Sequence, residues 1–257
     1  MFSRIDFIMV EPSHPGNVGS AARALKTMGF SNLVLVNPRV AGVARNAEAI
    51  SLASGAIDVL NSARICTSLE EAMADSTLAF ALTARGRDLG PPACDVREAA
   101  VLAREHLAAD GAGHGRVCVL LGTERSGLTN EHIALCQRIC HIPANPQYSS
   151  LNVAQALQLV AWEMRYALLT EGALAATSPD GRPMPGPAPA PGNSVQALLA
   201  HWEEALIDVK FLDPAHPKKL MPRMRHMFAR AQLSQDEVDM MRGVCTAMIA
   251  TARGRKS

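Results

Sequence analysis

Short apolar runs alternate with amphipathic stretches along the first 170 residues of the chain. An uninterrupted apolar run predicts a strand covered on both faces, because such a strand turns no side to water. Runs of this kind occupy residues 5–10, 33–36, 78–82, 117–121 and 139–142. Apolar residues at helical spacing occur at residues 18–28, from about 68, from about 95 and at 151–169. This alternation predicts an α/β fold, a parallel sheet with helices on both faces.

The helix expected at residues 18–28 carries its own signals for start and orientation. Asn17 is a natural N-cap, and Gly29 stands just past the helix end. A helical wheel places Gly19, Arg23 and Thr27 opposite an apolar stripe of Val18, Ala22, Leu25 and Met28. Arg23 should therefore project away from the core, where a guanidinium can pair with a phosphate or a carboxylate. The alternative for Arg23 is an ordinary exposed arginine that binds no ligand. The alternative for Asn17 is a helix cap without any further role.

The composition changes after the last of these helices. Six prolines interleave with alanine and glycine at residues 172–192, which predicts an extended, mobile linker. Helical patterns return at about 194–209, 219–230 and 235–252, the first with a stripe that suits a core or a dimer seam: Leu198, Trp202, Leu206 and Val209. We expect an α/β domain at residues 1–170, a linker at 171–193 and a small all-helical extension at 194–257.

Composition narrows the class of protein. With 257 residues, 48% of them apolar, the chain can fill a sizeable core. No run approaches the roughly 20 apolar residues of a membrane span, and the run at 7–10 is too short for a signal peptide, so a cytoplasmic location is expected. The six cysteines fall mostly within expected strands or helices, which favours reduced, buried thiols over a disulfide framework.

Basic residues gather in the helical extension although the net charge is only +1. The stretch from Pro214 to Ala231 has no carboxylate and contains His216, Lys218, Lys219, Arg223, Arg225, His226 and Arg230. A polyanion such as RNA is a plausible partner for this stretch. The alternative is a solvated helix face.

Polar or glycine-rich loops follow several of the expected strands. Open α/β sheets bind their ligands at the carboxyl ends of strands, so these loops are candidates for a common site. The loop after residues 5–10 lacks the glycine spacing of a dinucleotide fingerprint, which disfavours a nicotinamide cofactor. Cys136, Cys140 and His141 have no second ligand pair, so no metal site is expected.

Three motifs in order resemble one family. Asn17 to Arg23, then Gly122-Thr123-Glu124 with Gly127-Leu128, then Ile142-Pro143 with Ser149 to Val153 are similar to the three motifs of the SPOUT RNA 2′-O-ribose methyltransferases. Thr83-Ala84-Arg85 and the helical extension with Phe228-Ala229-Arg230-Ala231 resemble the TrmJ branch of that family. The likeness runs nearly end to end, apart from the proline-rich linker.

The resemblance implies a deep trefoil knot at the C-terminal side of the α/β domain, S-adenosylmethionine as cofactor and a homodimer that completes two active sites. The cofactor contacts of the family fall on Thr83, Ala84, Arg85, Gly122, Ile142, Ser149, Ser150 and Leu151. The residues available for catalysis in these motifs are Asn17, Arg23, Glu124, Ser150 and Asn152, and the family pattern gives Arg23 the central role.

Methyl transfer to a ribose hydroxyl needs an aligned sulfonium donor and a group that orients the hydroxyl or accepts its proton. A guanidinium is a poor base because its pKa exceeds about 12, so we interpret Arg23 as a clamp on the target phosphate or oxygen. Ser150 and Asn152 would hold the loop and the substrate hydroxyl, and Glu124 would fix the loop between motifs.

The resulting expectation is methylation of the ribose 2′-hydroxyl of the first anticodon-loop nucleotide of tRNA, position 32, cytidine or uridine, with no DNA or membrane partner. Two alternatives remain open. One is a related methyltransferase acting on ribosomal RNA, and the other is a non-catalytic RNA-binding module.

Overall fold

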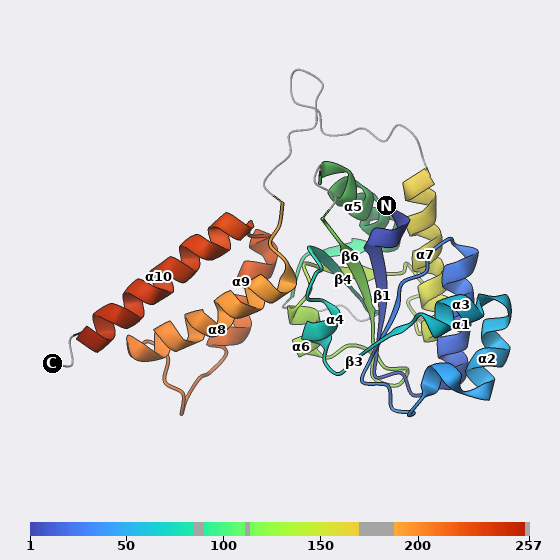
Figure 1. Ribbon diagram of the computed structural model, residues 1–257, viewed down its shortest axis with the longest axis horizontal. Helices are drawn as coiled ribbons and strands as arrows, with labels where there is room; N and C mark the ends of the chain where they lie inside the picture. Colours follow the sequence, from blue (N-terminus) through green and yellow to red (C-terminus); the bar gives the residue numbers. More distant parts are fainter. Residues whose placement is uncertain (85–89, 111–113, 170–187, 255–257) are drawn as a thin grey trace, which may run out of the picture.

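The computed structural model describes residues 1–84, 90–110, 114–169 and 188–254. In these residues seven parallel strands form one sheet in the order β3-β2-β1-β6-β4-β7-β5 (Figure 1). Their bounds are β1 Ile5–Val10, β2 Leu33–Val36, β3 Arg64–Cys66, β4 Leu78–Leu82, β5 Ala93–Asp95, β6 Val117–Leu121 and β7 Arg138–His141. The parallel sheet and all five expected strands are thereby confirmed.

Two short strands, β3 and β5, are additional to the expected ones. Each has three residues and forms one edge of the sheet. Arg64 and Ile65 of β3 are exposed, so this segment shows no apolar run from which a covered strand could be predicted.

Helices cover both faces of the sheet, as the alternation predicts. One face packs against α1 (Pro15–Thr27), α5 (Val96–Ala109) and α7 (Val153–Leu169), with α2 (Ala47–Ala53) and α3 (Ile57–Asn61) outside α1. The other face packs against α4 (Leu69–Ala72) and α6 (Asn130–Ala134). Alternate residues of β1 divide between the two cores, because side chains alternate along a strand: Ile5, Phe7 and Met9 on the first face, Ile8 and Val10 on the second.

Helix α1 differs from the expected one-sided helix. Gly19, expected opposite the apolar stripe, is buried, because α2 lies against this side of α1. A Cβ at Gly19 would overlap the backbone of Ala49 in α2, so glycine permits the close approach of the two helices.

The C-terminal unit consists of α8 (Gly192–Asp208), α9 (Leu220–Ala231) and α10 (Gln235–Gly254), which confirms the expected helical extension. We call these helices with residues 188–191 and the loops between them the tail. Its small core contains Leu198, Phe228, Val238, Cys245 and Ile249. Trp202 packs edge-on against Phe228 with 5.9 Å between ring centroids, which bears out a core role for its stripe, although Val209 at the end of the stripe is exposed.

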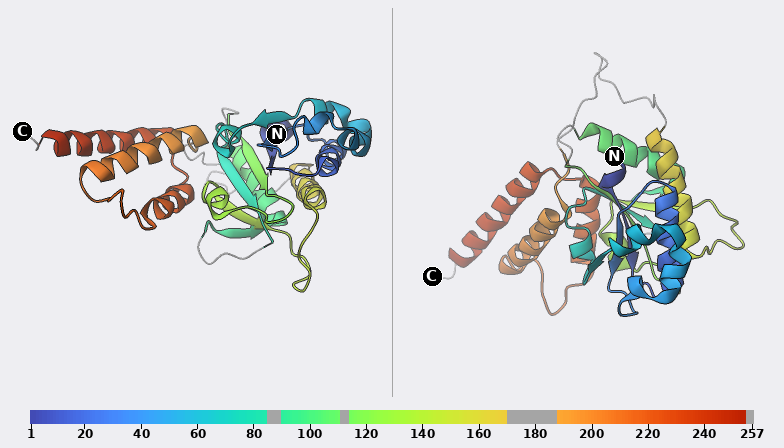
Figure 2. Two further views of the ribbon diagram at one scale, coloured as in Figure 1. Left: turned by 90° about the horizontal axis from the view of Figure 1, so that it is seen from below. Right: turned by 45° about the vertical axis from the view of Figure 1, so that its right-hand side comes forward.

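The tail lies on the outer side of α4 and α6, away from α1 and α7 (Figures 1 and 2). The first amides of α8 make the connection: Gly192 N–H donates to the carbonyl of Ser76 at 3.1 Å, and Asn193 N–H to that of Ala74 at 3.2 Å. Helix α9 contacts α6. Most of the expected linker lies outside the described residues, so its extended, mobile character stays a prediction.

All six cysteines lie in the described residues, where they are buried and form no disulfide. No helix among the described residues is both long and apolar enough to cross a membrane.

Candidate functional site

The loops after β4, β6 and β7 meet at the carboxyl edge of the sheet and line one pocket. Seven of the eight residues expected to bind the cofactor line it: Thr83, Ala84, Gly122, Ile142, Ser149, Ser150 and Leu151. The eighth, Arg85, lies outside the described residues. The pocket gains apolar surface from Leu82, Leu121, Val153 and Ala156, and it gains hydroxyls from Thr123 and from three serines, Ser126, Ser149 and Ser150. The pocket therefore offers both an apolar wall and polar edges to a ligand.

The loop after β6 folds back on itself over Gly122. A bridge pairs Thr123 with Gly127, whose N–H donates to the Thr123 carbonyl at 3.0 Å. Gly127 has a φ of +71°, a conformation that favours glycine. A Cβ at Gly122 would overlap the backbone of Gly127 and Leu128, so the turn requires glycine there as well.

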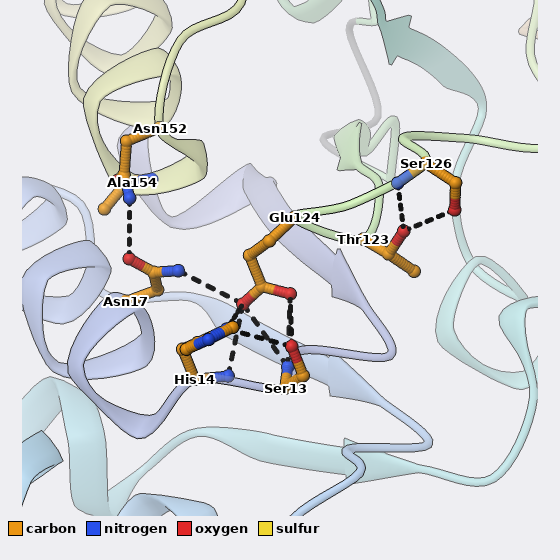
Figure 3. A network of polar contacts seen from close by, with 8 residues as sticks. All are labelled: Ser13, His14, Asn17, Thr123, Glu124, Ser126, Asn152 and Ala154. Carbon is orange, nitrogen blue, oxygen red and sulfur yellow. Dashed lines mark hydrogen bonds and ion pairs between the residues drawn. The ribbon is translucent and has the colours of Figure 1, made fainter.

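Glu124 projects from this loop toward the start of α1 (Figure 3). The N–H of Ser13 donates to Oε2 at 3.2 Å and its hydroxyl donates to the same oxygen at 2.9 Å. The other oxygen, Oε1, accepts from the His14 N–H at 3.3 Å and from Asn17 Nδ2 at 3.2 Å. The amides at the start of a helix lack intrahelical partners, so the carboxylate satisfies donors that would otherwise be open.

The same contacts set the charge of Glu124. Its side chain is only 14% exposed, and this burial alone would raise its pKa. The backbone hydrogen bond of its own residue and those from Asn17 and Ser13 outweigh burial and hold the pKa below the usual glutamate value. Glu124 is therefore an ionised anchor whose oxygens already accept several hydrogen bonds.

Asn17 carries the connection from Glu124 to α7. Asn152 Nδ2 donates to Asn17 Oδ1 at 2.9 Å, and Asn152 Oδ1 accepts from the Ala154 N–H at 2.9 Å (Figure 3). Asn152 thus caps α7 with one amide atom and binds Asn17 with the other. The loops after β1, β6 and β7 are joined by this set of contacts, which we call the Glu124 network: Ser13, His14, Asn17, Glu124 and Asn152.

The expectation that Asn17 caps its helix is wrong. Helix α1 begins three residues earlier than expected, with Pro15 at its first position and His14 as N-cap. Proline suits the first helical position because the missing N–H has no intrahelical acceptor there. The Asn17 side chain is consequently available for Glu124 and Asn152.

Ser150 and Arg23 differ from the other expected catalytic residues. Ser150 lines the pocket, and no described residue forms a hydrogen bond with its hydroxyl. Arg23 is exposed, as expected, and its guanidinium has no ion-pair partner among the described residues. It lies outside the pocket residues, so the described chain does not bring Arg23 to the other four.

A second hollow adjoins the pocket and shares Glu124 and Leu151 with it. Its other lining includes Asn17, Ser20, Glu48, Asn152, Gln155 and Gln158. Ser13 and His14 received no role in the network from sequence reasoning, although their place directly after a strand was a usable signal. Among the described residues no three His, Cys, Asp or Glu side chains gather as a metal site would require.

Comparisons with known proteins identify the family of this chain. Residues 4–162 match the SpoU rRNA Methylase family, and residues 193–257 match the C-terminal domain of the tRNA methyltransferase TrmJ. The tRNA (cytidine/uridine/adenosine-2′-O-)-methyltransferase TrmJ of Pseudomonas aeruginosa is 39% identical over 99% of this chain and 97% of its own length.

Two solved structures are also similar. A probable methyltransferase from Bordetella pertussis is 69% identical, with a TM-score of 0.62, over 65% of this chain and 98% of that one. TrmJ from Z. mobilis is 32% identical, with a TM-score of 0.79, over 95% and 98% of the two chains. The tail helices are included in this second match, as they are in the family match. The chain therefore belongs to the SpoU methylases and, within them, to the TrmJ family of tRNA methyltransferases.

Proposed function

We propose that this chain transfers a methyl group from S-adenosylmethionine to the ribose 2′-hydroxyl of the first anticodon-loop nucleotide of tRNA, position 32, cytidine or uridine. The observation that carries the proposal is the pocket at the ends of β4, β6 and β7, which adjoins a second hollow across Glu124 and Leu151. Two adjoining hollows suit a reaction that must bring a donor and an acceptor together.

The pocket fits S-adenosylmethionine in chemical character. Gly122 and Gly127 line the pocket without side chains, so backbone can border the ligand there. Apolar residues such as Leu82 and Ile142 suit the face of an adenine, and Ser149 and Ser150 offer hydroxyls to its polar groups. When bound, the cofactor supplies an electrophilic methyl group on a positively charged sulfur.

The chain's own residues divide the remaining work. Glu124, Asn17 and Asn152 already bind one another, so we assign them the positioning of the loops after β1, β6 and β7. The Ser150 hydroxyl lines the pocket without a described hydrogen bond, which supports a direct contact with substrate or cofactor. The resemblance gives Arg23 the central role, which we interpret as orienting the target phosphate or oxygen.

Arg23 lies outside the pocket of its own chain, so it can contact a site only if a second copy of the chain supplies one. This supports the inferred homodimer. Helix α7 turns a row of large side chains to solvent: Leu159, Trp162, Tyr166 and Leu169. Trp162 and Tyr166 stack with 6.5 Å between ring centroids. An exposed apolar row of this kind is typical of a protein interface. The trefoil knot and the cytoplasmic location stay predictions.

The test is transfer of labelled methyl from S-adenosylmethionine to unmodified bulk tRNA, with the label mapped by nuclease digestion. We expect label on an anticodon-loop ribose, lost in Arg23→Ala while S-adenosylmethionine binding persists. Arg97→Ala, which changes another exposed arginine on α5 outside both hollows, is the matched control and should keep activity.

The other outcomes separate the alternatives. Label on ribosomal RNA but not on tRNA would show that the substrate is ribosomal RNA. Label on neither, with no cofactor binding, would favour a non-catalytic RNA-binding module. Loss of cofactor binding in a folded Arg23→Ala variant would contradict the clamp role.

A further inference from the structure

The segment that joins α8 to α9, residues 209–219, presents an aromatic ring to solvent. Phe211 is 68% exposed, although the next residue, Leu212, is only 5% exposed and packs against Leu206 and Met221. Because Leu212 is fixed in the core of the tail, Phe211 cannot turn inward without displacing its neighbour. The ring is therefore held outside the tail core rather than left there by a loose chain end.

Backbone contacts fix the same segment. The N–H groups of Phe211 and Leu212 both donate to the carbonyl of Leu206, at 2.9 and 3.0 Å. Lys210, between α8 and Phe211, has a φ of +61°, the left-handed conformation that closes many helices. Glycine is the usual residue at such a position, because a side chain there costs free energy. A lysine at this turn adds a charge beside the ring that glycine would not supply.

The same segment carries cations without ion-pair partners. Lys210, Lys218 and Lys219 are exposed, and none has an ion-pair partner among the described residues. The neighbouring carboxylates are engaged elsewhere: Asp208 accepts from Arg253 at 2.7 Å, and Asp213 lies 3.2 Å from His216. The segment at residues 209–219 therefore keeps a positive charge.

An exposed aromatic ring in one short segment with unpaired lysines suits a nucleobase and the phosphates next to it. A base stacks on an aromatic face whatever its sequence, and the lysines neutralise the phosphates next to it. An apolar protein partner would instead have to strip water from the lysines without providing counter-charges. The charges therefore favour RNA over an apolar protein surface.

We propose that Phe211 is a base-stacking residue, on which one unpaired base of an RNA substrate lies while Lys210, Lys218 and Lys219 contact the adjoining phosphates. The proposal rests on the RNA-directed function proposed above and names a recognition residue outside the pocket. It requires a single-stranded or flipped base, because bases inside a duplex expose no face for stacking.

The test measures the dissociation constant of the full-length protein for unmodified bulk tRNA at one fixed salt concentration. Phe211→Ala and Phe211→Leu should each weaken binding about tenfold, because stacking on an aromatic ring contributes on the order of a tenfold or greater change in affinity per base. Phe211→Trp should bind as tightly as the wild type. Met240→Ala removes another exposed apolar side chain, on α10, and should leave binding unchanged.

Salt dependence gives a second readout. Phe211→Ala should leave the slope of affinity against salt unchanged, because the ring carries no charge, whereas Lys219→Gln should lower the slope by about one phosphate contact. Wild-type affinity in Phe211→Ala would overturn the proposal. So would tight binding by Phe211→Leu, which indicates simple apolar contact, or a change in oligomeric state in Phe211→Ala, which indicates a protein interface.

These outcomes are separable from the fate of the proposed function. If the wild type binds tRNA through Phe211 but transfers no methyl group, the stacking proposal stands and the methyltransferase proposal fails. If methyl transfer occurs and Phe211→Ala binds tRNA normally, the reverse holds.

Discussion

The loops at the strand ends and the tail differ in whether their polar groups have partners within the protein. In the Glu124 network each carboxylate oxygen accepts from more than one donor, and Asn17 and Asn152 connect it to α7. In the tail Lys210, Lys218 and Lys219 have no ion-pair partner among the described residues, and four buried nitrogens there have no hydrogen-bond partner: His201 Nδ1, Trp202 Nε1, Arg225 Nε and His226 Nδ1.

The difference indicates that the polar groups at the strand ends position reacting groups, whereas the charges of the tail attract a polyanion. Groups that are hydrogen-bonded before a ligand arrives cost little to organise at the moment of reaction, which suits a site for chemistry. Charges without an internal partner remain available to a polyanion and act over a wider range of geometries. The predictions below test this division, beginning with the largest expected effect.

Gly122→Ala should abolish cofactor binding in a folded protein, because the new Cβ overlaps the backbone of Gly127 and forces the loop after β6 to move. Isothermal titration with S-adenosylmethionine measures the effect. Gly243→Ala is the control, since a Cβ at that position in α10 meets open space, and it should bind normally. Unchanged cofactor affinity in Gly122→Ala would show that this loop does not shape the pocket.

Glu124→Gln should lower the single-turnover methyl transfer rate about 100-fold, since displacing a reacting group by about 1 Å costs that much. The amide keeps the shape of the carboxylate but places an NH₂ against the donors of Ser13 and His14. Affinity for tRNA should be unchanged, because the tail is untouched. Glu105→Gln, an exposed change on α5, is the matched control. If Glu124→Gln lost tRNA binding but kept the methyl transfer rate, Glu124 would serve tRNA binding rather than positioning.

Gly192→Ala should raise the KM for tRNA roughly fivefold, the effect of about 1 kcal/mol typical of a single substitution. A Cβ there would lie 2.8 Å from the Met73 carbonyl oxygen and would push α8 off the domain. Gly55→Ala, where a Cβ meets open space, is the control. Cofactor affinity should stay constant in both. An unchanged KM in Gly192→Ala would mean that the tail binds tRNA without a fixed position.

The smallest effect concerns acid pH. The folded-state pKa of Glu124 is lowered, so its contribution to stability is present above the pKa of the unfolded chain and is lost as pH falls through the folded pKa. Thermal melting of the wild type, followed from pH 7 down to about pH 3, should therefore show a decline in melting temperature at the acid end. The Glu124→Gln variant should decline less. If the melting temperatures of the wild type and the variant fell equally with pH, other carboxylates would be responsible for the loss of stability in acid.

The sheet could be predicted from sequence because its central strands are apolar on both faces, a local signal that tertiary packing reinforces. The converging loops followed from the same strands, since the carboxyl ends of parallel strands share an edge. The short edge strands β3 and β5 could not be predicted, because Arg64 and Ala93 are exposed and give no pattern.

Asn17 illustrates the limit of local rules. An Asn before a helical stripe is a good cap, and nothing nearby in sequence indicates Glu124, 107 positions away. The burial of Gly19 likewise depends on the close approach of α2, which a helical wheel of α1 alone cannot predict. The contact of α8 with residues 74–76 depends on backbone groups and so leaves no side-chain signal.

The Glu124 carboxylate at the start of α1 has an electrostatic consequence for the entry of RNA. A helix N-terminus is a ready anion-binding site, and free amides there would bind a phosphate. Here a side chain of the same protein supplies the anion, so the open end of α1 is already neutralised and cannot retain a misplaced phosphate. The cations left open to a polyanion are then those of the tail, where Lys210, Lys218 and Lys219 have no ion-pair partner among the described residues.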